Sequence, residues 1–184
     1  MIHHPTRLDL FRSLPPGSVG AEIGVWRGYF SQEILQLPNI AKLYMVDTWG
    51  QHGPEYASDP RAGDDHAKNM AEARANVAGF GERAELVQMD GLAWLKERPY
   101  RPKLNFVYLD AAHDFDSVFN QLIACIDTVR HDGVIVGHDY RTCPQSIRMG
   151  FGVVEAVSRF CEACEYKLTA LALDEWPSYK LERA

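Results

Sequence analysis

Acidic residues and glycines occur in this sequence where a ligand could approach the backbone closely. Glu22 and Gly24 end an apolar run that begins at Ser18, and Gly28 follows where a helical pattern opens. Glycines let the chain approach a ligand, and the start of a helix presents free N–H groups to it. Asp47 ends the next apolar run, and an acid at that place can accept both hydroxyls of a ribose. The spacing therefore predicts a nucleoside site.

The acid at Glu22 indicates which nucleoside this turn suits. A carboxylate two residues before a glycine repels a pyrophosphate and attracts an ammonium group. The Gly-x-Gly-x-x-Gly fingerprint of dinucleotide sites is absent, because Trp26 and Arg27 stand between Gly24 and Gly28. S-adenosylmethionine, a nucleoside that carries an amino acid, has the required chemistry. An NAD-dependent oxidoreductase is the disfavoured alternative.

A second group of chemically active residues follows the fourth and fifth expected strands. Asp110 and His113 follow one of these strands, and His138 and Asp139 follow the other. Methyl transfer to a hydroxyl requires a group that removes its proton, and a divalent cation can lower the pKa of that hydroxyl. The same residues also allow a structural interpretation, in which Asp110 and Asp139 cap turns and His113 is a packed loop histidine.

Strands and helices alternate along the chain, which predicts an α/β fold with a parallel sheet. The expected strands are 18–24, 43–47, 84–89, 104–110, 134–136, 166–173 and 178–181, and the last two form a hairpin. The expected helices are 5–14, 28–37, 64–80, 91–97 and 116–130, with a turn at 131–133 and a further helix by Val153. Residues 1–184 are predicted to form one domain, in which 1–17 is a helical extension and 48–63 is a lid loop.

Composition restricts the partners and the location. The formal charge is −6 and the pI is about 5.6, whereas a nucleic-acid partner normally requires a basic surface. No apolar run reaches the ~18 residues of a transmembrane helix, and the N-terminus lacks the core of a signal peptide. We therefore expect a cytoplasmic protein that binds neither nucleic acid nor membrane.

The motifs, taken in order, resemble those of class I S-adenosylmethionine-dependent methyltransferases. They are Glu22-Ile-Gly24 with Gly28, Asp47-Thr-Trp49, Asp90, Asp110-Ala-Ala-His113 and Gly133-Val-Ile-Val-Gly-His138-Asp139-Tyr140. The resemblance spans residues 18–182 and is nearest to the branch that contains sugar O-methyltransferases of macrolide biosynthesis. It implies a Rossmann-like, seven-stranded sheet, mostly parallel, with an antiparallel C-terminal hairpin and helices on both faces.

The resemblance also assigns cofactor contacts to seven residues: Glu22, Gly24, Gly28, Asp47, Trp49, Asp90 and Asp110. The first two hold the methionine part, Asp47 the ribose, Trp49 the adenine face and Asp90 the adenine amino group. Ordinary structural roles are the alternatives. Glu22 would then be a solvated charge at a strand end, the glycines would be turn residues, Asp47 and Asp90 helix N-caps, and Trp49 a surface packing anchor.

The resemblance places Asp110, His138 and Asp139 at metal-binding positions and His113 at the position of the base. His138 departs from the family pattern, in which an acid is more usual. Magnesium prefers oxygen ligands, and an imidazole favours manganese, iron or zinc. The predicted function is O-methylation of a small polar hydroxyl compound, a sugar or a secondary metabolite. A non-catalytic module that binds the cofactor is the alternative. The N-terminal helix and the terminal hairpin are candidate surfaces for a homodimer.

Overall fold

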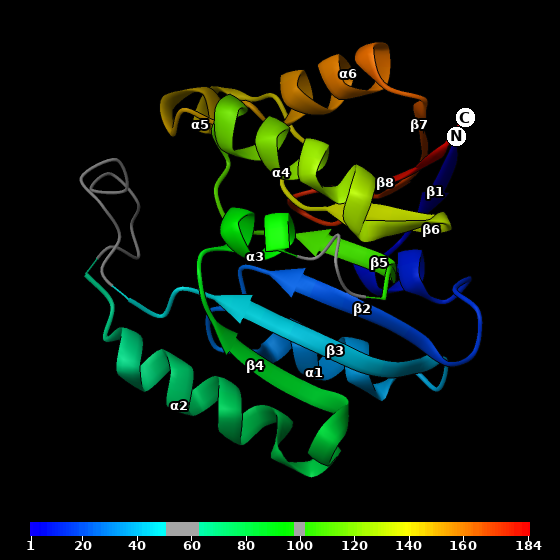
Figure 1. The fold of residues 1–184 in the computed structure, drawn as a ribbon. Helices are drawn as coiled ribbons and strands as arrows, with labels where there is room; N and C mark the ends of the chain where they lie inside the picture. The colour runs from blue at the N-terminus through cyan, green and yellow to red at the C-terminus, as the bar shows by residue number, and fades with distance from the viewer. Residues whose placement is uncertain (51–62, 98–101) are drawn as a thin grey trace.

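A computed structural model describes residues 1–50, 63–97 and 102–184, and its centre is an eight-stranded sheet (Figure 1). The strands are β1 (Ile2–His4), β2 (Ser18–Ile23), β3 (Ile40–Asp47), β4 (Ala84–Gln88), β5 (Leu104–Leu109), β6 (Val129–Gly137), β7 (Tyr166–Ala172) and β8 (Ser178–Arg183). Their order across the sheet is β1-β7-β8-β6-β5-β2-β3-β4. Among the strand pairs of the described residues, the two that include β8 are antiparallel and the others are parallel.

Helices cover both faces of the sheet (Figure 1). They are η1 (Arg7–Phe11), α1 (Tyr29–Gln36), α2 (His66–Val77), η3 (Ala78–Arg83), α3 (Gly91–Glu97), α4 (Phe115–Thr128), α5 (Pro144–Arg148) and α6 (Val153–Ala163). One core lies between the sheet and η1, α1 and α2, and it includes Phe11 and Phe106. The second core lies under α3, α4 and α6 and includes Ile23 and Phe160. The central strands are apolar along most of their length because both of their faces are buried.

The order of the strands creates one place where a ligand can bind. From β2 the chain moves first to β3 and β4 on one side, and later to β5 on the other side. In open α/β sheets, ligands bind at such a reversal, beyond the carboxyl ends of the strands. The loops that follow β2, β3, β5 and β6 all begin at this edge.

The N-terminal segment differs from its prediction. The sequence predicts a helix at 5–14 and a sheet of seven strands, whereas Ile2–His4 pairs in parallel with Ala170–Ala172 as an eighth strand at the sheet edge. The helix after it is a short 3-10 helix, η1, which begins where Thr6 and Asp9 cap each other. Strand pairing across the length of a chain leaves no local periodicity, so the pattern of residues 2–4 carries no sign of it.

The predicted turn at 131–133 is wrong, because these residues lie within β6. The register between β5 and β6 shifts between Leu104 and Phe106, so the expected turn residues are accommodated in an irregularity of the strand. Gly133 is needed there, since a Cβ on it would lie 2.7 Å from the Asn105 carbonyl oxygen. Strand β3 likewise begins at Ile40, earlier than the expected residue 43. The antiparallel hairpin of β7 and β8 and the coverage of both faces are confirmed.

Two further expectations concern the lid loop at 48–63 and the absence of a transmembrane helix. Most of the expected lid loop, residues 51–62, lies outside the described residues. Within the described part of the chain, no helix has the length and apolar character needed to span a bilayer.

Candidate active site

The glycine turn after β2 lies directly against the end of β5. Gly24 has a φ of +91°, and a Cβ on it would lie 2.2 Å from the carbonyl oxygen of Asp110. The backbone N–H of Asp110 donates to the Ile23 carbonyl at 2.8 Å. Gly28, also left-handed with a φ of +74°, is the N-cap of α1. Only glycine meets both requirements at position 24, so this turn is built for close backbone approach.

Asp47 organises the same turn from the neighbouring strand. Its Oδ2 accepts hydrogen bonds from the backbone N–H groups of Val25 and Trp26, both at 2.8 Å, and its Oδ1 accepts from Trp49 N–H at 2.9 Å. The carboxylate therefore caps the loop after β2 and does not cap a helix. A carboxylate has about four acceptor positions, so Oδ1 retains capacity for a further donor.

Trp49 and Asp90 have structural partners in this arrangement. Trp49 is 4% exposed, and its Nε1 donates to the Trp26 carbonyl at 2.8 Å, so the ring is a packing anchor inside the core and not at the surface. Asp90 is exposed, and its Oδ1 accepts from Ala93 N–H at 2.8 Å at the start of α3. The N-cap expected as the alternative role of Asp90 is present.

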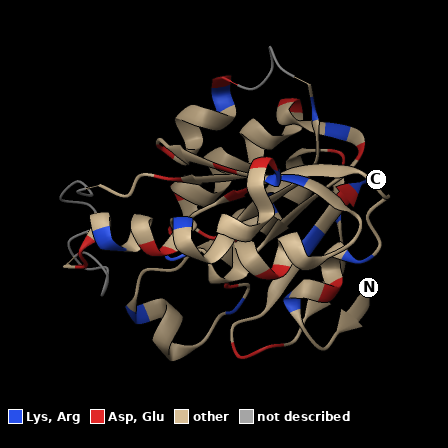
Figure 2. Cartoon of the chain, turned by 90° about the horizontal axis from the view of Figure 1, so that it is seen from below, with Lys and Arg blue, Asp and Glu red and all other residues tan. Residues whose placement is uncertain are grey.

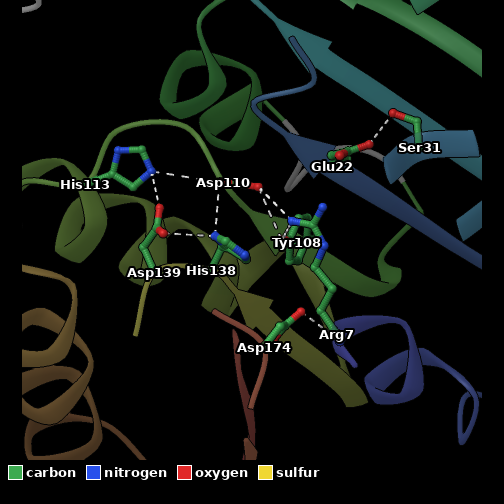
Figure 3. A network of polar contacts seen from close by, with 9 residues as sticks. All are labelled: Arg7, Glu22, Ser31, Tyr108, Asp110, His113, His138, Asp139 and Asp174. Carbon is green, nitrogen blue, oxygen red and sulfur yellow. Dashed lines mark hydrogen bonds and ion pairs between the residues drawn. The ribbon is translucent and has the colours of Figure 1, made fainter. Parts of the chain in front are cut away.

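Glu22 is buried at 2% exposure, which rules out a solvated strand-end charge. Its Oε2 accepts a hydrogen bond from the Ser31 hydroxyl of α1 (Figure 3). Burial raises the pKa of Glu22 to about 8, although the Ser31 hydroxyl opposes this shift. Glu22 is therefore protonated near neutral pH, and a cationic group bound beside it would favour its ionised form.

The raised pKa of Glu22 predicts a pH-dependent stability. The folded state holds this proton more tightly than the unfolded state, so the contribution to stability is full below about pH 4.5 and is lost as pH rises to about 8. We expect Glu22→Gln, compared with wild type, to be more stable by on the order of 3 kcal/mol at pH 8.5 and little changed at pH 4.5. Urea unfolding at both pH values measures this.

Glu33, exposed on α1, provides the matched control. Glu33→Gln should change stability little and equally at the two pH values. A Glu22→Gln variant that is destabilised equally at both pH values would contradict a protonated, buried Glu22.

Four polar residues meet at the carboxyl ends of β5 and β6 (Figure 3). His113 Nε2 lies 2.6 Å from Asp139 Oδ2 and 3.8 Å from Asp110 Oδ1. His138 Nδ1 lies 3.0 Å from Asp139 Oδ1 and 3.9 Å from Asp110 Oδ1. The side chains are only 11% to 22% exposed. The structure thus brings together the four residues predicted from positions far apart in the sequence.

The charges in this cluster are strongly coupled. Burial disfavours a charged His113, but Asp110 and Asp139 outweigh it and raise the pKa of His113 to about 9. Burial would also raise the pKa of Asp139, but the hydrogen bonds from His113 and His138 hold it well below its ordinary range. In this arrangement His113 is therefore a cation between two carboxylates.

The donor group that converges most tightly differs from the predicted metal set. Among the described residues, one ligand atom each of Asp110, His113 and Asp139 lie within 4.8 Å of one another. His138 reaches this group through Asp139. The structure thus places His113 within the donor group, whereas the sequence separated a base, His113, from the metal ligands Asp110, His138 and Asp139.

The sequence did not indicate Arg7, Tyr108 or Phe151 as part of this site. Arg7 Nη1 lies 3.2 Å from the Tyr108 hydroxyl, which lies 3.3 Å from Asp110 Oδ2. The Phe151 ring stacks on His113, with centroids 4.5 Å apart. Tyr108 could have been found, because alternate residues of a strand share a face and it precedes Asp110 by two. No sequence signal ties residue 7 or 151 to this edge.

Backbone strain is concentrated at the same edge of the sheet. In the described ranges, the non-glycine residues with positive φ are Trp26, Trp49 and Asp139, at +52°, +36° and +59°. They follow β2, β3 and β6 respectively. Left-handed non-glycine residues typically cost about 1–3 kcal/mol and gather at functional sites. This distribution supports the assignment of the edge as the active site.

The sheet order, the antiparallel β8 and the glycine turn after β2 define the Rossmann-like α/β fold of class I methyltransferases. A family model described as a methyltransferase domain matches residues 21–140. The chain belongs to this methyltransferase family, for whose members S-adenosylmethionine is the expected cofactor. No protein of curated function matches the sequence.

Solved structures with the same fold carry several activities. A putative rRNA-methylase from Clostridium thermocellum has a TM-score of 0.67 and 9% identity, over 96% of this chain and 95% of its own. N-methyltransferase NodS from Bradyrhizobium japonicum WM9 has a TM-score of 0.65 and 14% identity, over 96% and 91%. Spermidine synthase from Thermotoga maritima has a TM-score of 0.62 and 16% identity, over 97% of this chain and 56% of its own. At these identities the likeness shows the fold alone.

Proposed function

We propose that this protein transfers a methyl group from S-adenosylmethionine to a hydroxyl oxygen of a small polar compound, a sugar or a secondary metabolite. The observation that carries the proposal is the convergence of Asp110, His113, His138 and Asp139 beside the Gly24 turn. In this proposal the four residues supply a general base and the ligands of a divalent cation, and they lie next to the place where the methyl donor binds. The resemblance of the sequence motifs to the branch that contains the macrolide sugar O-methyltransferases supports this choice of acceptor.

The cofactor contacts follow the carboxyl edge of three adjacent strands. The free acceptor capacity of Asp47 Oδ1 suits a ribose hydroxyl, and the buried carboxyl of Glu22 suits the ammonium group. Asp90 lies at the start of α3, on the side proposed for adenine. Trp49 supports the loop after β2 through its hydrogen bond to the Trp26 carbonyl. Gly24 and Gly28 have no side chain, so the ligand can lie directly against the backbone at these two positions.

The proposed reaction breaks the S–CH3 bond of the sulfonium and forms an O–CH3 bond on the acceptor, leaving S-adenosylhomocysteine. The hydroxyl proton passes to Nε2 of a neutral His113. With both carboxylates charged, Asp110 and Asp139 keep that nitrogen protonated. A base role therefore requires Asp110 and Asp139 to be partly neutralised when the site is loaded.

The donor set fits a divalent cation. Two carboxylates and two imidazoles at these distances present oxygen and nitrogen ligands together, a combination that manganese, iron or zinc accepts more readily than magnesium. Asp110, His138 and Asp139 would hold the ion. When bound, it would lower the pKa of the acceptor hydroxyl.

A small acceptor is favoured over a nucleic acid. The formal charge of −6 opposes a polyanion, and acidic and basic positions are interspersed over the elements in Figure 2. The rings of Phe151 and Trp176, whose centroids lie 5.8 Å apart, extend from His113 and offer apolar faces on which a sugar ring or a flat metabolite can pack.

Methyl transfer from labelled S-adenosylmethionine to a panel of polyhydroxylated compounds tests the proposal. Product that carries the label on oxygen supports it. Binding of S-adenosylhomocysteine without transfer to any acceptor would favour a non-catalytic module. Binding of NAD in place of S-adenosylhomocysteine would favour an oxidoreductase. Transfer of the label to RNA would contradict the proposal that the acceptor is a small molecule.

Removal of divalent ions should abolish most of this transfer and leave cofactor binding intact. After dialysis against EDTA, we expect a loss of on the order of 100-fold or more, restored better by Mn²⁺ than by Mg²⁺. Asp139→Asn should show the same loss without restoration, since Asn tolerates a left-handed backbone but binds cations weakly. Asp132→Asn, at an exposed position of β6, is the control. Full activity of the EDTA-treated protein would remove the metal from the proposal.

A further inference from the structure

A partly buried arginine from the N-terminal helix lies at the centre of the candidate site. Arg7 reaches from η1 to the end of β5, where its Nη1 lies 3.2 Å from the Tyr108 hydroxyl and 3.6 Å from Asp110 Oδ2 (Figure 3). Its Cζ lies 3.9 Å above the centroid of the Phe30 ring, at the start of α1. Its backbone N–H donates to Asp174 Oδ2 in the β7–β8 connection at 3.4 Å. The side-chain contacts hold the guanidinium between β5 and α1, and the backbone contact anchors residue 7 to the β7–β8 connection.

The geometry of the proposed cofactor site explains why a cation is needed there. A nucleoside whose ribose lies at Asp47, after β3, and which crosses the Gly24 turn, after β2, brings its amino-acid end to Asp110, after β5. These are adjacent strands, so the ligand spans two strand spacings, about 10 Å. That end carries both an ammonium group and a carboxylate. Asp110 attracts the ammonium group, as Glu22 does once it has ionised beside that cation, but both acids then repel the carboxylate.

Arg7 retains the donors that a carboxylate requires. Among its contacts with described residues, the guanidinium donates through Nη1, and the ring of Phe30 supports its face. A guanidinium has five N–H donors in a planar fork that matches a carboxylate. The side chain is 29% exposed, so a ligand at this edge can reach it.

We propose that Arg7 binds the α-carboxylate of the cofactor, opposite Asp110 and Glu22, which take its ammonium group. This inference rests on the proposed S-adenosylmethionine-dependent function. The N-terminal segment is then part of the cofactor site, and the two acids and the arginine together are matched to a zwitterion.

Calorimetry with two ligands tests this assignment. S-adenosylhomocysteine has the carboxylate, and its decarboxylated analogue, S-adenosyl-3-thiopropylamine, lacks only that group. We expect Arg7→Gln to weaken S-adenosylhomocysteine by on the order of tenfold or more and the analogue by less than about threefold. Arg7→Lys should lie between wild type and Arg7→Gln for the first ligand. Arg12→Gln, at an exposed position further along the same segment, should change neither affinity.

The results separate this inference from the proposed function. Equal losses for both ligands in folded Arg7→Gln would overturn the inference, because a merely structural role does not distinguish them. Should Arg7→Gln fail to fold, the wild-type protein decides: a tenfold preference for the carboxylate-bearing ligand supports the inference, and equal affinities overturn it. Binding of neither ligand to wild-type protein would instead overturn the proposed function, and the inference with it.

Discussion

Gly24→Ala should unfold the cofactor turn and abolish binding of S-adenosylhomocysteine. An alanine Cβ would lie 2.2 Å from the Asp110 carbonyl oxygen and 2.7 Å from the Ala111 Cα, so two backbone segments must separate. A φ of +91° is also strained for any residue with a side chain. Together these effects should cost on the order of 3 kcal/mol or more. Urea unfolding and calorimetry measure the two losses.

Two glycines separate the clash from the backbone strain. Gly17 has a φ of +81°, and an added Cβ there would meet nothing within 4 Å, so Gly17→Ala reports strain alone. Gly79 has open space and no positive φ, and Gly79→Ala should be nearly neutral. A Gly24→Ala variant no less stable than Gly17→Ala would show that the β2 turn does not need to lie against β5.

His113→Ala should reduce methyl transfer by about 100- to 10,000-fold, the range expected for loss of a general base. The affinity for S-adenosylhomocysteine should stay unchanged, because Glu22, Gly24 and Asp47 are intact. His131→Ala, exposed near the amino end of β6 and remote from the site, is the control. Single-turnover rates with a labelled donor, together with calorimetry, provide the measurement.

The same variant decides whether His113 is a base or a ligand, because one Nε2 cannot do both. If His113 is the base, Mn²⁺ affinity should change little in His113→Ala, and added imidazole should restore part of the rate. A large loss of Mn²⁺ affinity would place His113 among the ligands, as its position beside Asp110 and Asp139 allows. Turnover equal to wild type would exclude both roles.

Sequence reasoning located the strand ends and the residues on them with good accuracy. Gly24, Asp47, Asp110 and Asp139 all lie at the predicted edge, because an apolar strand followed by glycine or acid is a local signal. The contacts that these side chains make are harder to predict from the sequence. Asp47 caps the loop after β2, and Glu22 is buried against Ser31, since each depends on which element packs above it.

The α/β class, the glycine turn and the acids and histidines at the strand ends can all be predicted from the sequence, because periodicity and turn chemistry are encoded within a few residues. Three features become visible in the folded chain alone: the eighth strand at Ile2–His4, the contact of Arg7 with Asp110, and the position of His113 between two carboxylates. Those features depend on strand order and on contacts between segments that are far apart along the chain, which no local pattern records.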